Sequence, residues 1–177
     1  NIMGPLTVLL MALENSMTRE AVVLFKAGSG ELMNFVRKTR LKWVLVFLIY
    51  SAIASVFAQK LLVFCYGSEF GQFFVLVYWM ALASVPQVLS RIQAVKLRTT
   101  GNLHIIQRAN TISMYIMFVV APLAVYFFGL NGAGFSILVQ QSSITILQYS
   151  GDRIFIIRMV KKSIFIAGLR KNNKEAD

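Results

Sequence analysis

Neutral polar side chains recur at helical spacing inside the apolar segments of this chain, and they are its best candidates for binding chemistry. Residues three, four, seven or eight positions apart share one face of a helix, so each set forms a polar stripe. Such stripes either hold neighbouring helices together by hydrogen bonds or line a hydrated cavity for a polar substrate, and both interpretations stay open. The sets are Ser51, Ser55 and Gln59; Ser84 and Gln87, followed by Arg91; Ser136, Gln140 and Ser143; and Gln141, Thr145 and Gln148.

Four basic residues, Arg40, Lys42, Arg91 and Arg108, stand where apolar segments meet polar ones. Cations in such places orient a chain in the bilayer and meet anionic lipid headgroups. They also pair strongly with phosphate, so they are candidates for contact with the pyrophosphate of a lipid-linked substrate. The sequence leaves both roles open.

Catalytic and metal-binding residues are scarce. The chain has one histidine, His104, and one cysteine, Cys65, and no acidic residue lies inside an apolar segment. Neither a metal cluster, nor a carboxylate pair, nor a histidine-activated thiol follows from these residues, and no glycine-rich phosphate loop is present. We therefore expect no enzyme and no cofactor.

The composition is that of a membrane protein. Hydrophobic residues make up 57% and charged residues 14% of the 177 residues, with a mean hydropathy of +0.67. Soluble domains average roughly 45–50% apolar and about 25% charged residues. The net charge of +11 raises nucleic acid as a partner. Because the cations lie between apolar segments and not on one patch with interleaved aromatic residues, no nucleic acid is expected.

Hydropathy predicts an all-α, polytopic transmembrane helix bundle in residues 1–150. The first apolar run is shorter than the roughly 20 residues that a span needs. Because the chain also begins with Asn1, we expect a helix whose start lies upstream. The predicted segments are a partial helix at 1–13, a polar connection at 14–42, helices at about 43–66, 73–90, 109–128 and 133–150, and a basic tail at 151–177.

The distribution of positive charge predicts the orientation. The stretches 14–42, 91–108 and 151–177 contain 17 of the 18 lysines and arginines, whereas the alternate connections contain only Lys60. Loops rich in lysine and arginine stay in the cytoplasm. We therefore expect a multi-pass membrane protein with a cytoplasmic C-terminus and anionic lipids as partners.

The order of these elements resembles that of the polysaccharide (O-antigen) flippases, a family of the multidrug/oligosaccharidyl-lipid/polysaccharide exporter superfamily. The resemblance covers about residues 1–150 and is one of pattern: apolar helices joined by glycine-containing turns and basic connections. The segments that carry it are Met3–Pro5, Glu14–Arg19, Gly28–Trp43, Leu62–Phe70 and Gly129–Gly134.

The resemblance implies a twelve-helix transporter of two lobes in the bacterial cytoplasmic (inner) membrane. This chain would be its C-terminal part, helices eight to twelve. Such a protein carries undecaprenyl-pyrophosphate-linked oligosaccharide outward by alternating access, so a lipid-linked oligosaccharide and the missing N-terminal helices are the implied partners. A cation-coupled multidrug exporter of the same superfamily remains an alternative. Two further alternatives are a membrane-embedded glycosyl or acyl transferase and a non-transporting scaffold.

Overall fold

The structure is a computed structural model that describes the backbone of residues 4–174 and the side chains of residues 8–155 and 157. The described chain is all-α, as expected, and contains no strand. Its elements are α1 (Gly4–Ala27), α2 (Ser29–Tyr66), the short 3-10 helix η1 (Ser68–Phe73), α3 (Phe74–Thr99), α4 (Leu103–Phe128) and α5 (Leu130–Lys174).

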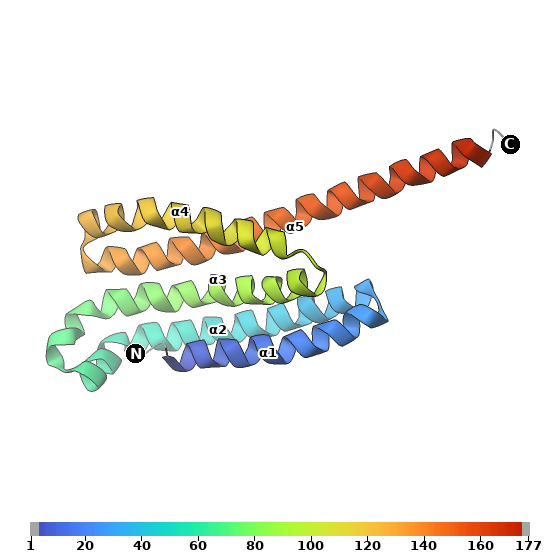
Figure 1. Ribbon diagram of the computed structural model, residues 1–177. Coiled ribbons are helices and arrows are strands. Elements are labelled where there is room, and N and C mark those ends of the chain that lie inside the picture. The colour runs from blue at the N-terminus through green and yellow to red at the C-terminus, as the bar shows by residue number, and fades with distance from the viewer. Residues whose placement is uncertain (1–3, 175–177) are drawn as a thin grey trace.

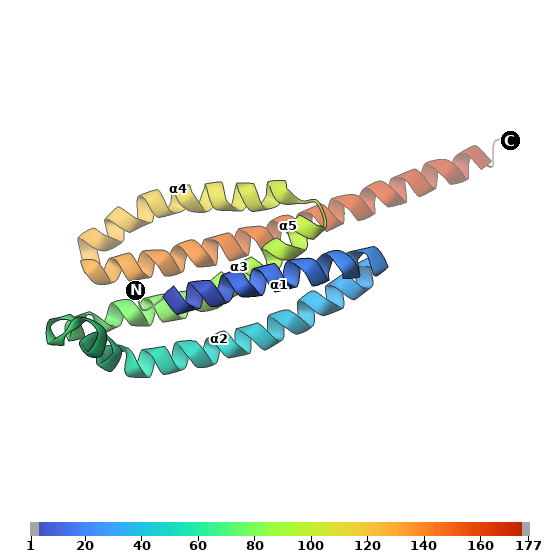
Figure 2. The ribbon, with the colours of Figure 1, turned by 60° about the horizontal axis from the view of Figure 1, so that its bottom comes forward.

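Helix α3 lies at the centre of the bundle (Figure 1). It packs most extensively against α2 on one side and α5 on the other. Figure 2 shows α1 lying along α2 and α3, while α4 lies on the far side of α5. Successive helices alternate in direction, so α1, α3 and α5 run parallel to one another.

The junctions between helices therefore gather at two ends of the bundle (Figure 1). Each junction contains a glycine with positive φ, as at Gly28 and Gly129, because that conformation carries no steric penalty in glycine. One end holds the Gly28 and Gly101 junctions, with Lys26 and Arg98 beside them. We call it the basic end. Lys60 is the one described lysine or arginine near the other end.

A cluster of buried apolar side chains joins α1, α2 and α3. Phe47 from α2 and Ala21 from α1 are fully buried in this cluster, which also contains Val88 and Ile92 of α3. In a bilayer, lipid tails are as apolar as these side chains, so close packing and not exclusion of water holds the helices together.

The helices are longer than predicted. Residues 14–42, predicted as a polar connection, belong to α1 and α2 and are interrupted only at Gly28. The prediction was wrong because Met17 and Ala21 are buried while the neighbouring charged residues face outward, which makes this part of α1 an amphipathic helix. Residues 91–99 likewise continue α3, and α5 continues through most of the predicted tail to Lys174.

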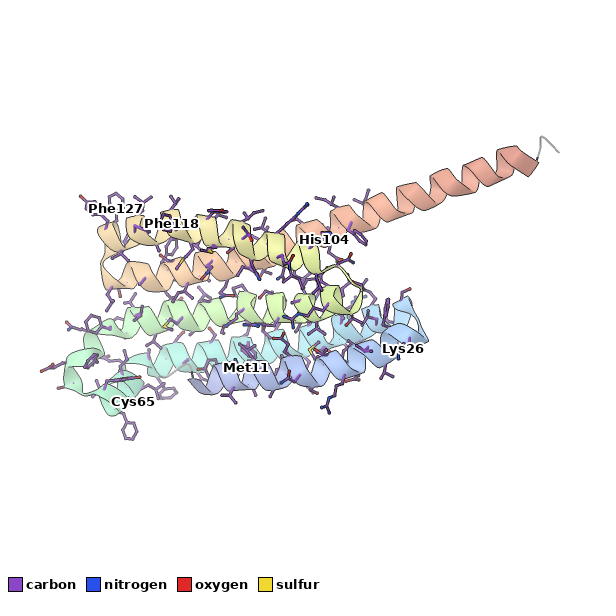
Figure 3. The ribbon with its side chains drawn as sticks, in the orientation of Figure 1. Met11, Lys26, Cys65, His104, Phe118 and Phe127 are labelled. Carbon is purple, nitrogen blue, oxygen red and sulfur yellow. The ribbon has the colours of Figure 1, made fainter. Side chains whose placement is uncertain are left out.

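Three described helical stretches are long and apolar enough to cross a membrane: Ser29–Tyr66, Ser68–Thr99 and Leu103–Phe128. These three stretches indicate that the chain is a membrane protein. Helix α5, which contains the predicted span 133–150, is not among them, because its glutamines and serines lower the hydropathy. Only 11% of the most apolar stretch of α4 is buried, and Figure 3 shows Phe118 and Phe127 pointing away from the bundle.

Candidate functional site

A polar seam runs along the contact between α3 and α5 toward the basic end. Its centre is a buried ion pair, in which Lys96 Nζ donates to Asp152 Oδ2 at 2.5 Å. The amide of Gln93 donates to the same oxygen at 3.0 Å. Only 9% of the Lys96 side chain and 11% of the Asp152 side chain are exposed, so each charge depends on its partner for stabilisation.

The seam continues two helical turns away from the basic end. Thr145 Oγ1 donates to the backbone carbonyl of Pro86 at 2.8 Å. The pairs Pro86–Thr145 and Gln93–Asp152 are both separated by 59 residues, so α3 and α5 lie parallel without a change of register. Gln148, on the same helix between these contacts, is only 2% exposed, and its Oε1 has no hydrogen-bond partner among the described residues.

Helix α2 joins the seam through one side chain. Arg40 donates to the hydroxyl of Tyr149 at 3.1 Å, and its guanidinium carbon lies 5.7 Å from the centre of the tyrosine ring. A cation above an aromatic face is attracted by the ring quadrupole. Arg40 is therefore engaged within the bundle and is half-buried.

A second charged cluster connects α1 with α3 at the basic end. Glu14 accepts hydrogen bonds from Arg91, at 3.1 Å, and from Arg98. The Glu14 side chain is only 12% exposed, whereas the side chains of Arg91 and Arg98 are 46% and 43% exposed. Solvent screens such a pair, so it contributes little stability, but it neutralises much of the charge of Arg91.

The predicted stripe on α2 does not form a polar surface within the bundle. Ser51 is buried, Ser55 is half-buried and donates to the Ser51 carbonyl, and Gln59 is exposed. On α3, Ser84 is fully buried with no partner for its hydroxyl among the described residues, and Gln87 is half-buried.

The two predicted stripes on α5 have different surroundings. Ser136 is buried and donates to the Gly132 carbonyl, while the Gln140 carbonyl accepts from Ser113 of α4. In the second stripe, Thr145 and Gln148 belong to the seam. Gln141 and Ser143 are half-buried.

None of the eleven neutral polar residues in the predicted stripes lines any of four well-formed grooves among the described residues. Their role in a cavity stays a prediction. The hydrogen bonds of Ser113 and Thr145 instead show that part of this polarity joins helices to one another.

The four phosphate-contact candidates occupy separate places at the basic end. Arg40 and Arg91 have the partners described above. Lys42 is exposed and lines a groove between α1 and α2, beside Leu13 and Trp43. Arg108 is exposed in a different groove, between α4 and α5.

Sequence reasoning missed the ion pair at the centre of the seam. Lys96 was predicted in a cytoplasmic loop, but it is buried in the last turns of α3. One signal was present: Asp152 is the only acidic residue between Glu69 and Glu175. It lies four residues after Gln148, on the same helical face, which marks that face as polar.

No metal centre appears in the described part of the chain. There, no three histidine, cysteine or acidic residues come together as metal ligands. Cys65 is exposed near one end of the bundle, whereas His104 lies toward the basic end (Figure 3). These two residues are too far apart to act as a nucleophile and its base.

Comparison with known proteins supplies no relative: no family model, no curated protein and no solved structure matches this chain. The geometry and the charge distribution of the chain itself therefore carry the functional argument.

Proposed function

We propose that this chain is the C-terminal part of a membrane transporter that flips lipid-linked oligosaccharide from the cytoplasmic to the outer leaflet. The observation that carries the proposal is the polar seam between α3 and α5, which contains a buried ion pair in a bundle whose helices include three stretches apolar enough to span a membrane. Ionisable groups within a membrane bundle are costly and usually mark a substrate or ion pathway. The resemblance to polysaccharide flippases is independent support.

The basic end faces the cytoplasm in this proposal, since that is where lysine-rich and arginine-rich connections remain. The substrate begins its passage there and presents a pyrophosphate. Of the four candidate cations, Lys42 and Arg108 are exposed and have no carboxylate partner among the described residues, so these two are the most available to meet this anion. Lys42 lies in the groove between α1 and α2, which also contains Glu20, and it is the one tested below. The neutral side chains on α2, α3 and α5 would exchange hydrogen bonds with the sugars as a cavity opens. The first lobe is supplied by upstream helices of the same protein.

Deletion of the gene in the bacterium that encodes the chain tests this function. We expect surface polysaccharide to disappear and lipid-linked repeat units to accumulate in the inner leaflet, and the intact gene to restore export. Lys42→Gln should lower export several-fold, while Arg37→Gln, which removes an exposed charge from the same helix, should not. Normal polysaccharide in the deletion strain would refute the proposal.

A cation-coupled multidrug exporter is the second candidate, and one observation favours it. The sequence has no acidic residue inside an apolar segment, but the structure pairs Lys96 with Asp152 between α3 and α5, where both are buried. A carboxylate that exchanges its lysine partner for a proton could couple transport to a gradient. Accumulation of cationic drugs in the deletion strain, with unchanged polysaccharide, would select this alternative.

A further inference from the structure

A groove of about 320 Å³ lies between α4 and α5 near the basic end. Its floor is apolar and includes Ile105 and Leu147, and Phe155 stands beside the ring of His104, with 6.2 Å between the ring centres. The helices touch beneath it at Gly151, where a Cβ atom would lie only 2.7 Å from a methyl group of Ile105. Glycine thus allows the close approach that closes the bottom of the groove.

The rim of the groove is cationic. His104 and Arg108 line it and are both exposed, and no acidic side chain is among its lining residues. The acidic residue nearest in sequence, Asp152, faces α3 and is paired with Lys96. Among the side chains that the structure describes, no carboxylate pairs with Arg108 or His104. The rim therefore offers positive charge to an anion from outside the chain.

Along one face of α4, polar and basic side chains are followed by an apolar one. His104, Arg108 and Ile112 are spaced at i, i+4 and i+8, so they lie in a row on one helical face. The row begins in the first turn of α4 at the basic end and passes into the helix that is apolar enough to span a membrane. A ligand with an anionic head and an apolar tail would match this order.

We propose that this groove binds an anionic glycerophospholipid of the surrounding bilayer. The phosphate lies between His104 and Arg108, and the first part of an acyl chain lies against Ile112 and Leu147. The groove is near the lower limit of ligand sites, which are about 300–1,000 Å³, so it fits one headgroup and not an oligosaccharide repeat. The proposal requires that the chain lies in a bilayer and does not depend on the substrate that the protein transports.

Native mass spectrometry of the detergent-purified chain tests this site, with phosphatidylglycerol and phosphatidylcholine as matched probes. We expect retention of phosphatidylglycerol in preference to phosphatidylcholine. His104→Gln with Arg108→Gln should weaken the binding of phosphatidylglycerol at least about fivefold, the effect of roughly one lost cation near a phosphate. Arg37→Gln, which removes a basic residue of α2 that does not line the groove, should leave this binding unchanged.

A second variant tests the shape of the groove without changing its charge. Ser150 is exposed and lines the groove, so Ser150→Trp should occupy the space of the acyl chain and weaken lipid binding while His104 and Arg108 remain. If the double charge variant fails to fold, Ser150→Trp and Arg108→Lys decide the question, the latter retaining binding. Equal retention of the two lipids, or wild-type affinity in Ser150→Trp, would overturn the proposal. Displacement of phosphatidylglycerol by inorganic pyrophosphate alone would show a free-phosphate site and would overturn it too.

Discussion

Removal of one member of the Lys96–Asp152 pair should destabilise the bundle far more than removal of both. The two side chains are 9% and 11% exposed, so neither charge is well hydrated once its partner is gone. Breaking a buried ion pair typically costs about 3–5 kcal/mol, whereas replacing both charges by apolar residues is often neutral or stabilising.

The structure indicates losses at or below the lower end of this range for the two single variants. In Lys96→Met, Asp152 keeps one hydrogen bond from Gln93, so we expect a loss of about 3 kcal/mol in the free energy of unfolding. In Asp152→Leu, Lys96 lies in the last turns of α3 and can extend toward the interface, which limits the loss to roughly 2–3 kcal/mol. The double variant should lose at most about 1 kcal/mol, giving a coupling energy of roughly 4 kcal/mol.

Unfolding of the purified chain in mixed micelles with increasing dodecyl sulfate measures these values, with the fluorescence of Trp43 and Trp79 as the signal. Arg98→Gln is the control, because the Arg98 side chain is 43% exposed and its pair with Glu14 should contribute less than about 1 kcal/mol. If the double variant loses the sum of the two single losses, the charges are not coupled and the description of the seam is wrong.

For two other contacts we expect smaller changes in the free energy of unfolding, and the same unfolding experiment measures each of them. Gly132→Ala should destabilise the α4–α5 contact by about 1–3 kcal/mol, because its Cβ would lie 2.0 Å from the backbone carbonyl oxygen of Ala124. Gly30→Ala, in a helix with open space around it, should change stability by no more than about 1 kcal/mol, and a similar loss in both variants would contradict the close approach. Thr145→Val should lower the free energy of unfolding by about 0.6 kcal/mol, and by roughly 1.7 kcal/mol at most, because it removes the hydrogen bond to the Pro86 carbonyl. Thr145→Ser keeps that hydroxyl and should retain most of the stability, so an equal loss in both would argue against the bond.

Hydropathy predicted the helices but not their ends. Long apolar runs identify segments such as 43–66, because a bilayer requires them. Because residues 14–42 contain many charged side chains, hydropathy did not predict that α1 continues through them. An amphipathic helix at the basic end needs only a few buried side chains, such as Met17 and Ala21. The glycine at residue 28 was the true junction, with a φ of 152°.

The sequence predicted which residues of a single helix form a polar stripe, but it did not predict which stripes meet in the seam. The polarity of Thr145 and Gln148 was evident from their spacing, but their partners on α3 were not. That partnership depends on α3 and α5 lying parallel and adjacent, with α4 displaced to the far side of α5. Hydrophobic periodicity indicates which face of a helix is buried and does not specify which other helix covers it. The buried partnership of Lys96 with Asp152 is therefore a product of tertiary structure.

A leaflet-transfer assay with the full-length protein in lipid vesicles tests the central proposal most directly. A fluorescent oligosaccharide linked through pyrophosphate to undecaprenol is placed in the leaflet that contacts the basic end, and its arrival in the opposite leaflet is followed with a lectin. The proposal predicts protein-dependent transfer that Lys42→Gln slows several-fold relative to Arg37→Gln. No transfer of the oligosaccharide, together with gradient-driven transport of cationic drugs that Asp152→Asn abolishes, would contradict it.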